Sequence, residues 1–231
     1  MTRHATRRAM LLGVPATAAM MGVAPAKKTG ALSVRVTTLK PPGRVIRRRR
    51  ERRHHEDVVV FLRGVDETLP ETTNEVEEIR QIDEQFVPRV RVVLVGTTLS
   101  FPNDDRFQHN VFSPESSAGF DLGSYKSGTT KTYVPDAPGE VKVFCDIHPH
   151  MEAYVLVVDT TYHGISGDDG RIWIGDIPPG SYTWEVWTPH ADRAFGKVTI
   201  EGAKTSKLEL DLVVHPSPRH LDKDGKPYPD Y

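Results

Sequence analysis

The sequence is poor in cysteine, and it lacks the common signatures of catalysis. Of its 231 residues, one is cysteine. A single cysteine cannot form a disulfide within the chain, so a disulfide scaffold is excluded. The sequence contains no phosphate-binding glycine loop, no HExxH zinc motif and no nucleophile signature. Hydrolase and kinase activities therefore find no support, and we expect a protein that is not an enzyme.

The remaining composition favours an all-β protein. Hydrophobic residues make up 38% of the chain, which suffices for a sizeable core. Glycine and proline are plentiful at 18 each, and the apolar residues come in short runs between turn signals.

The first 26 residues have the pattern of an export signal. Three arginines, Arg3, Arg7 and Arg8, precede a short apolar stretch that proline interrupts, and Ala24, Pro25 and Ala26 fit a small-residue cleavage site. The paired arginines are similar to the twin-arginine export motif, although such pairs also occur in ordinary signal peptides. We expect residues 1–26 to be a signal peptide and the protein to be periplasmic or extracellular.

Charge is distributed unevenly over the rest of the chain. Residues 27–53 carry a net charge of +10, and residues 54–231 carry −14. Residues 27–56 therefore form a basic linker on an acidic body. Its densest part, Arg47–Arg53, could contact a membrane surface or an acidic partner, or serve as a solvated tether that folds back on the acidic body. Binding to nucleic acid is not expected outside the cytoplasm.

Alternating apolar residues predict a first β unit over residues 75–158. Val141, Val143 and Cys145 share one face of a strand, so Cys145 should point inward at the strand's end. In an earlier predicted strand, His109 lies on the same face as Val111.

A smaller β unit is predicted over residues 160–213, with turns at Asp168–Gly170 and Pro178–Gly180. Four strands are few for an independent sandwich. Apolar runs within residues 30–65 could supply the missing strands, in which case the first unit is inserted in a loop of the second. Residues 214–231 are rich in proline and charge and should form a flexible tail. The histidines there and on predicted loops, His190 and His220 among them, are expected at the surface.

The segment CDIHPHM carries the most specific chemical signal. A thiolate from Cys145, an imidazole from His148 and a thioether from Met151, together with the distant His109, make the ligand set of a mononuclear electron-transfer copper site. Cys145 could instead be a buried structural thiol and Met151 a core residue, with glutamine or a carbonyl as the axial ligand. The convergence of four suitable residues favours one copper ion as the cofactor.

Residues 79–158 resemble the cupredoxins, the group of plastocyanin, pseudoazurin and amicyanin. The loop from Cys145 to Met151, with two residues in each gap, is similar to that of amicyanin, and Asn110 follows His109 as in the family. The resemblance implies a Greek-key β-sandwich, a blue copper site and a one-electron carrier. It also implies that Asn110 ties the ligand loops together and that electrons leave through His148, Pro149 and His150 to a transient redox protein partner.

One residue of the ligand loop departs from the family pattern. Asp146 follows the cysteine, where a small or amide residue is usual, and its charge would act on the copper site from outside the ligands. The smaller unit resembles carboxypeptidase regulatory-like domains, which implies an immunoglobulin-like or transthyretin-like sandwich. Two other functions remain open: copper storage or delivery, and an extracellular binding module in which the copper site is secondary.

Overall fold

The computed structural model describes residues 28–39, 57–66, 69, 74–114, 116–216 and 220–228. Within these ranges the chain forms seventeen β-strands and no helix, which confirms the predicted all-β class. No helix in the described ranges is long and apolar enough to cross a membrane. The predicted signal peptide, residues 1–26, and the basic segment Arg47–Arg53 lie outside the described residues.

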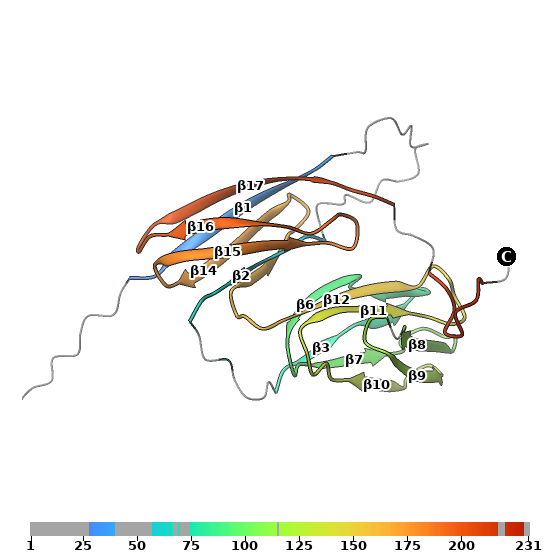
Figure 1. Ribbon diagram of the computed structural model, residues 1–231. Helices are drawn as coiled ribbons and strands as arrows, with labels where there is room; N and C mark the ends of the chain where they lie inside the picture. Colours follow the sequence, from blue (N-terminus) through green and yellow to red (C-terminus); the bar gives the residue numbers. More distant parts are fainter. Residues whose placement is uncertain are drawn as a thin grey trace, which may run out of the picture.

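One of the two units is a sandwich built from both ends of the chain, which we call the flanking unit (Figure 1). In its first sheet, β1 pairs in antiparallel fashion with β14 and in parallel with β17. In its second sheet, β2 lies between β13 and β15, and β16 forms the edge. The strands are β1 (Gly30–Leu39), β2 (Val59–Arg63), β13 (His163–Ile165), β14 (Arg171–Ile177), β15 (Gly180–Trp187), β16 (Ala194–Ile200) and β17 (Thr205–Val213).

The other unit, residues 76–158, leaves the flanking unit after β2 and returns to it at β13, so we call it the inserted unit. Its larger sheet has the order β6-β12-β11-β8-β9, its smaller sheet the order β10-β7-β3, and β4 and β5 form a separate hairpin. The strands are β3 (Val76–Glu78), β4 (Arg80–Ile82), β5 (Gln85–Val87), β6 (Val90–Leu94), β7 (Thr98–Pro102), β8 (His109–Ser113), β9 (Phe120–Tyr125), β10 (Thr130–Tyr133), β11 (Gly139–Phe144) and β12 (Glu152–Val158).

Alternation along β11 places the key residues of the inserted unit in its core. Val141, Val143 and Cys145 are buried in one cluster with Val111 of β8 and Met151. Because successive side chains of a strand point to opposite faces, Phe144 instead belongs to the cluster on the other side of the sheet. Cys145 thus continues the inward alternation of β11 directly after the strand ends, where the chain leaves the sheet.

Strand β2 is buried on both faces because it separates two cores. Val60 and Leu62 belong to the core of the flanking unit. Val59 and Phe61 point the other way, into a third cluster that joins the two units and includes Trp187. A strand covered on both sides reads as a continuous apolar run rather than as an alternating one, which explains the sequence VVVFL.

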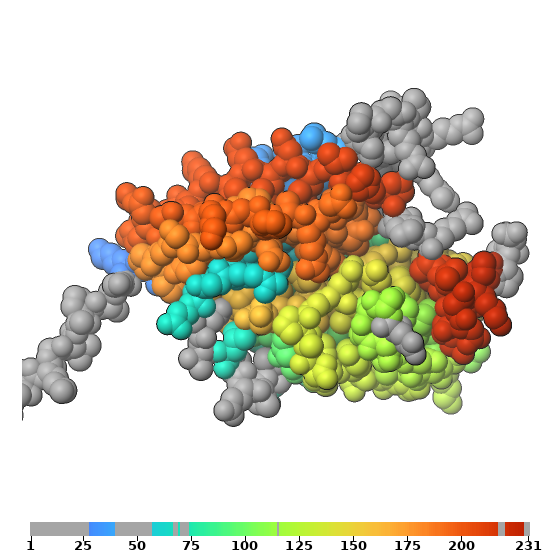
Figure 2. All heavy atoms as spheres, viewed as in Figure 1, coloured from blue at the N-terminus to red at the C-terminus, as the bar shows by residue number. Residues whose placement is uncertain are grey.

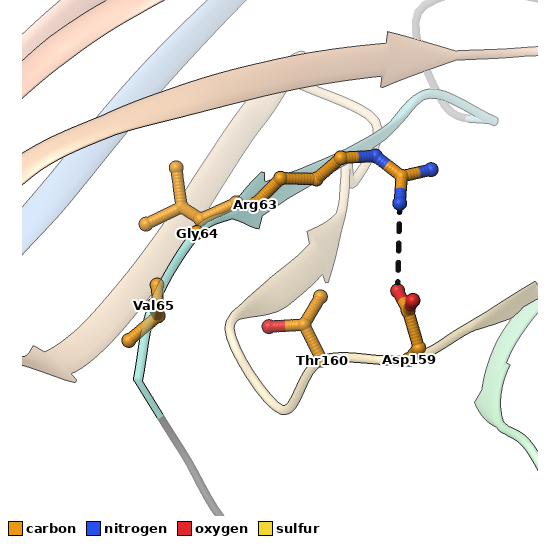
Figure 3. A pocket seen from close by; sticks show the side chains of 6 residues that line it. Arg63, Gly64, Val65, Asp159 and Thr160 are labelled. Atoms are coloured by element: carbon orange, nitrogen blue, oxygen red, sulfur yellow. Dashed lines mark ion pairs between the residues drawn. The ribbon is translucent and has the colours of Figure 1, made fainter.

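The junction between the units also contains charged side chains. Arg89 pairs with Glu152 of the inserted unit, lies 3.7 Å from Asp57, and contacts the ring of His190 from the flanking unit. At the other end, Arg63 of β2 lies 3.6 Å from Asp159, beside a hollow of about 210 Å³ (Figure 3). The expectation that His190 is a surface residue is wrong, because its side chain is buried in this junction.

The expectation of a flexible tail is wrong for residues 220–228, which we call the C-terminal strap. Figure 2 shows this red segment packed on the inserted unit. The ring of His220 stacks on Phe144 with the centroids 3.9 Å apart and an angle of 2° between the planes. The hydroxyl of Tyr228 donates a hydrogen bond of 2.7 Å to the carbonyl oxygen of Cys145. Because this segment is rich in proline and charge, its composition did not indicate that His220 and Tyr228 pack against the inserted unit.

Candidate metal centre

Two neighbouring strands bring the predicted ligands together at one end of the inserted unit. His109 begins β8, and Cys145 directly follows β11, with which β8 pairs in antiparallel fashion. The loop after Cys145 then folds back, because the amide of Met151 donates to the carbonyl of His148 and the amide of Cys145 donates to the carbonyl of Met151. This tight loop holds His148 beside both Cys145 and His109.

Three donor atoms converge in this pocket. The Nδ1 atoms of His109 and His148 are 3.0 Å apart, and Nδ1 of His148 is 3.8 Å from the sulfur of Cys145. All three atoms lie within 4.8 Å of one another. His109 and Cys145 are fully buried, whereas His148 is partly exposed. Within the described part of the chain, these residues form the only group of three or more histidine, cysteine or acidic side chains with metal-site spacing.

The spacing of the donors fits a single ion. Metal–nitrogen bonds of about 2.0 Å and metal–sulfur bonds of about 2.3 Å are usual for borderline-soft metals in proteins. At a tetrahedral angle of about 109°, such bonds require separations of about 3.3 Å between two nitrogens and about 3.5 Å between nitrogen and sulfur. The observed distances of 3.0 Å and 3.8 Å are close to these values. One ion could therefore bind without a large movement of the side chains.

The sulfur of Cys145 lies in an apolar pocket but receives backbone hydrogen bonds. Burial raises the pKa of the Cys145 thiol, while N–H groups of Ile147, Asn110 and His148 act in the opposite direction. The Ile147 amide nitrogen is 3.4 Å from the sulfur. A thiol in this setting binds a cation by releasing its proton, and the N–H groups then stabilise the thiolate.

Met151 is fully buried in the same cluster as Cys145. A role for Met151 as a ligand remains a prediction.

Burial also lowers the pKa of His148, and the neighbouring ring of His109 lowers it further. Both effects favour the neutral imidazole, which is the form that binds a metal.

An acidic residue that the sequence analysis missed lies behind His109. The Oδ2 atom of Asp105 is 3.1 Å from Nε2 of His109, on the side of the ring that faces away from Cys145 and His148. Backbone amides of Glu84 and Arg106 donate to the same carboxylate at 2.7 and 2.8 Å. Burial alone would raise the pKa of Asp105, but the hydrogen bonds from Glu84, His109 and Arg106 outweigh it and the pKa is lowered.

Local turn chemistry explains why Asp105 is rigid and why it was overlooked. Its amide donates to the side chain of Asn103, which in turn donates to backbone carbonyls of Phe107 and Tyr125. In the sequence these residues read as an ordinary turn, PNDD. The spacing of four residues between Asp105 and His109 was the signal that could have identified the pair.

The β4–β5 hairpin and the C-terminal strap border the ligand loop. Glu84, in the hairpin turn, lies 3.6 Å from the ring of the exposed His150. On the other side, the carboxylate of Asp146 accepts a hydrogen bond of 3.0 Å from the amide of Lys223. Asp146, which the sequence analysis placed near the copper site, thus anchors the strap.

Asn110 was expected to tie the two ligand segments together, and this role remains a prediction. Its side-chain amide donates to Asp121 of β9 at 2.7 Å. Its Oδ1 atom is buried and has no hydrogen-bond partner among the described residues. Its backbone N–H acts on the ligand loop, because it works against the burial that raises the pKa of the Cys145 thiol.

No family model matches the chain, and no curated protein matches it. Among solved structures, a reduced tryptophan-to-tyrosine mutant of amicyanin is similar, with 20% identity, a TM-score of 0.35, and coverage of 38% of this chain and 87% of that chain. A methionine-to-glutamine mutant of amicyanin in the Cu(I) form has 19% identity, the same TM-score and the same coverage. A purple cupredoxin from Nitrosopumilus maritimus has 23% identity and a TM-score of 0.32, and covers 37% of this chain and 100% of that chain.

Proposed function

We propose that the protein binds one copper ion through His109, Cys145 and His148 and acts as an exported one-electron carrier. The observation that carries this proposal is the convergence of two Nδ1 atoms and one sulfur within 4.8 Å. Two imidazoles and one thiolate in a mostly buried pocket are the donor set of blue-copper electron-transfer sites. When bound, copper would supply one-electron chemistry, because the ion can change reversibly between Cu(I) and Cu(II).

The protein would keep the ligands in nearly the same place in both copper states. His109 and Cys145 are held at the ends of paired strands, and two backbone hydrogen bonds close the loop that carries His148. A rigid donor set of this kind needs little rearrangement when the charge on the ion changes. Met151, buried beside Cys145, is the candidate for a weak axial ligand that adjusts the reduction potential.

The burial of the ligands favours electron transfer over copper delivery. Handing an ion to another protein requires the acceptor's ligands to reach it, but two of the three donors are fully buried. His148 is the partly exposed ligand, and Pro149 and His150 follow it on the surface of the loop. We propose that electrons leave through His148 to a transient redox protein that docks on this side.

The test is to add Cu(II) to the purified metal-free protein. We expect an intense visible absorption band from the thiolate–copper bond and reversible oxidation and reduction at a fixed potential. Cys145→Ser and His148→Ala should abolish the band. The matched control is His150→Ala, which removes an exposed imidazole of the same loop and should leave the band unchanged. A wild-type protein that binds no Cu(II), or a band that survives Cys145→Ser, would refute the proposal.

A similar substitution tests the axial position. Met151→Leu conserves the volume of the core, so it should cost less than about 1.5 kcal/mol of stability. If Met151 is a ligand, the band should shift and the reduction potential should change. An unchanged spectrum and potential would restrict Met151 to a core role.

A further inference from the structure

We propose that Asp105 is a positioning residue that fixes the ring tautomer of His109, turns its Nδ1 toward the metal and strengthens it as a donor to Cu(II). The role in donor strength rests on the proposed copper function, whereas the role in tautomer choice does not. The observation behind the proposal is the contact of 3.1 Å between Oδ2 of Asp105 and Nε2 of His109, with both side chains buried.

The environment of Asp105 determines the direction of this hydrogen bond. Two backbone N–H groups, from Glu84 and Arg106, already donate to the carboxylate. A carboxylate that receives such donors is ionised and can only accept, so Nε2 of His109 must carry the proton. In a neutral imidazole the other nitrogen, Nδ1, is then unprotonated. The buried histidine is thereby set in the form that can bind a metal before any ion arrives.

The second histidine presents its Nδ1 to the same point. The Nδ1 atoms of His109 and His148 are 3.0 Å apart, and binding of one ion requires both to be unprotonated. The ring of His148 is partly exposed, so a proton on it can exchange with solvent.

A hydrogen bond to a carboxylate also makes the ligating nitrogen more basic. A more basic imidazole stabilises Cu(II) more than Cu(I), which lowers the reduction potential. Loss of such a partner typically weakens metal affinity about 10- to 100-fold. If this loss falls on Cu(II), the potential of a one-electron couple rises by about 60 to 120 mV, at about 59 mV per tenfold change.

The first experiment uses the metal-free wild-type protein labelled with ¹⁵N. The ring nitrogen shifts of His109 and His148 report which atom of each ring carries the proton. We expect His109 to be protonated at Nε2. A His109 ring protonated at Nδ1 would overturn the proposal, and this result does not depend on copper.

The second experiment compares the reduction potentials of two variants. Asp105→Asn keeps the shape and one acceptor oxygen but removes the charge behind His109. Asp104→Asn is the matched control, because it removes a carboxylate of the same turn that pairs with Arg80 rather than with His109. We expect a rise of about 60 to 120 mV in Asp105→Asn, corresponding to the 10- to 100-fold effect, and a clearly smaller change in Asp104→Asn.

The two experiments separate failure of this inference from failure of the proposed function. Equal shifts in the two variants would mean that Asp105 acts as a distant charge, and the inference would be wrong while the copper carrier stands. A wild-type protein that binds no Cu(II) but shows His109 protonated at Nε2 would refute the carrier function and the effect on donor strength. The role of Asp105 in choosing the tautomer would remain.

Discussion

The two faces of β2 offer a direct test of how the flanking unit stabilises the inserted unit. Phe61 is buried against the inserted unit, and its neighbour Val60 is buried in the core of the flanking unit. Phe61→Ala removes contacts between the units, and Val60→Ala removes contacts within one of them. We expect Phe61→Ala to make opening of the inserted unit easier, and Val60→Ala to leave it nearly unchanged.

The magnitude follows from the burial of the side chain. Truncating a buried phenylalanine to alanine costs about 3–5 kcal/mol. The inserted unit has a separate core around Val143 and Val155, so it can open while the flanking unit stays folded. Opening exposes the face of β2 that carries Phe61. At about tenfold per 1.4 kcal/mol, Phe61→Ala should therefore increase the population of the open inserted unit by a factor on the order of 100 or more.

The chain provides a natural reporter for each unit. Cys145 is the single cysteine, is fully buried and lies in the inserted unit, so the rate of thiol modification in metal-free protein reports its opening. The three tryptophans, Trp173, Trp184 and Trp187, all lie in β14 and β15 of the flanking unit, so the main change of their fluorescence reports its unfolding. Trp187 belongs to the cluster between the units, so it adds a separate change when the inserted unit opens.

Three comparisons decide the outcome. Phe61→Ala should accelerate thiol modification strongly, whereas Val60→Ala should shift mainly the fluorescence transition in denaturant. Equal modification rates in Phe61→Ala and Val60→Ala would refute the reasoning. So would a Phe61→Ala rate equal to that of the wild type, because Phe61 would then contribute nothing to the inserted unit.

Two further substitutions test the contacts on either side of the ligand loop. Arg89→Met should lower the free energy of unfolding by about 3 kcal/mol, because it leaves the carboxylate of Glu152 mostly buried and without its cation. Denaturant titration measures this change. The control is Arg91→Met, which breaks the exposed ion pair with Glu77 and should cost less than about 1 kcal/mol. Tyr228→Phe should weaken the strap by about 1 kcal/mol through loss of the hydrogen bond to Cys145. Amide exchange in residues 220–228 should then be faster, and unchanged exchange would show that the His220 stack and the hydrogen bond from Lys223 to Asp146 hold the strap without Tyr228.

Local patterns in the sequence predicted the features that depend on strand periodicity. Alternation along Val141, Val143 and Cys145 placed the cysteine inward, and the structure buries all three in one cluster. The apolar runs near Leu32 and Val60 were predicted to be strands that could join the downstream strands. In the structure they pair with β14, β15 and β17. Such features follow from the side-chain period of two, which any stretch of sequence displays by itself.

Contacts between distant segments of unusual composition could not be predicted in this way. The strap combines prolines and charges, which are typical of unpacked chain, and its two aromatic anchors show no period. His190 lies in a predicted loop, and its burial depends on Arg89, about a hundred residues away. Asp105 sits in a turn whose composition is explained by turn chemistry alone. Each depends on tertiary packing that no short window of sequence contains.

The surroundings of the two histidines explain how one pocket can be both rigid and accessible. His109 is enclosed by the sandwich and fixed from behind by Asp105, so its position does not depend on solvent or on a partner. His148 lies on the loop between the β4–β5 hairpin and the C-terminal strap, and its ring remains partly exposed. In the proposed carrier, a redox partner would meet an imidazole whose nitrogen lies 3.0 Å from that of His109, while the sulfur stays buried. One buried and preset histidine beside one partly exposed histidine would then allow electrons to be exchanged without loss of the ion.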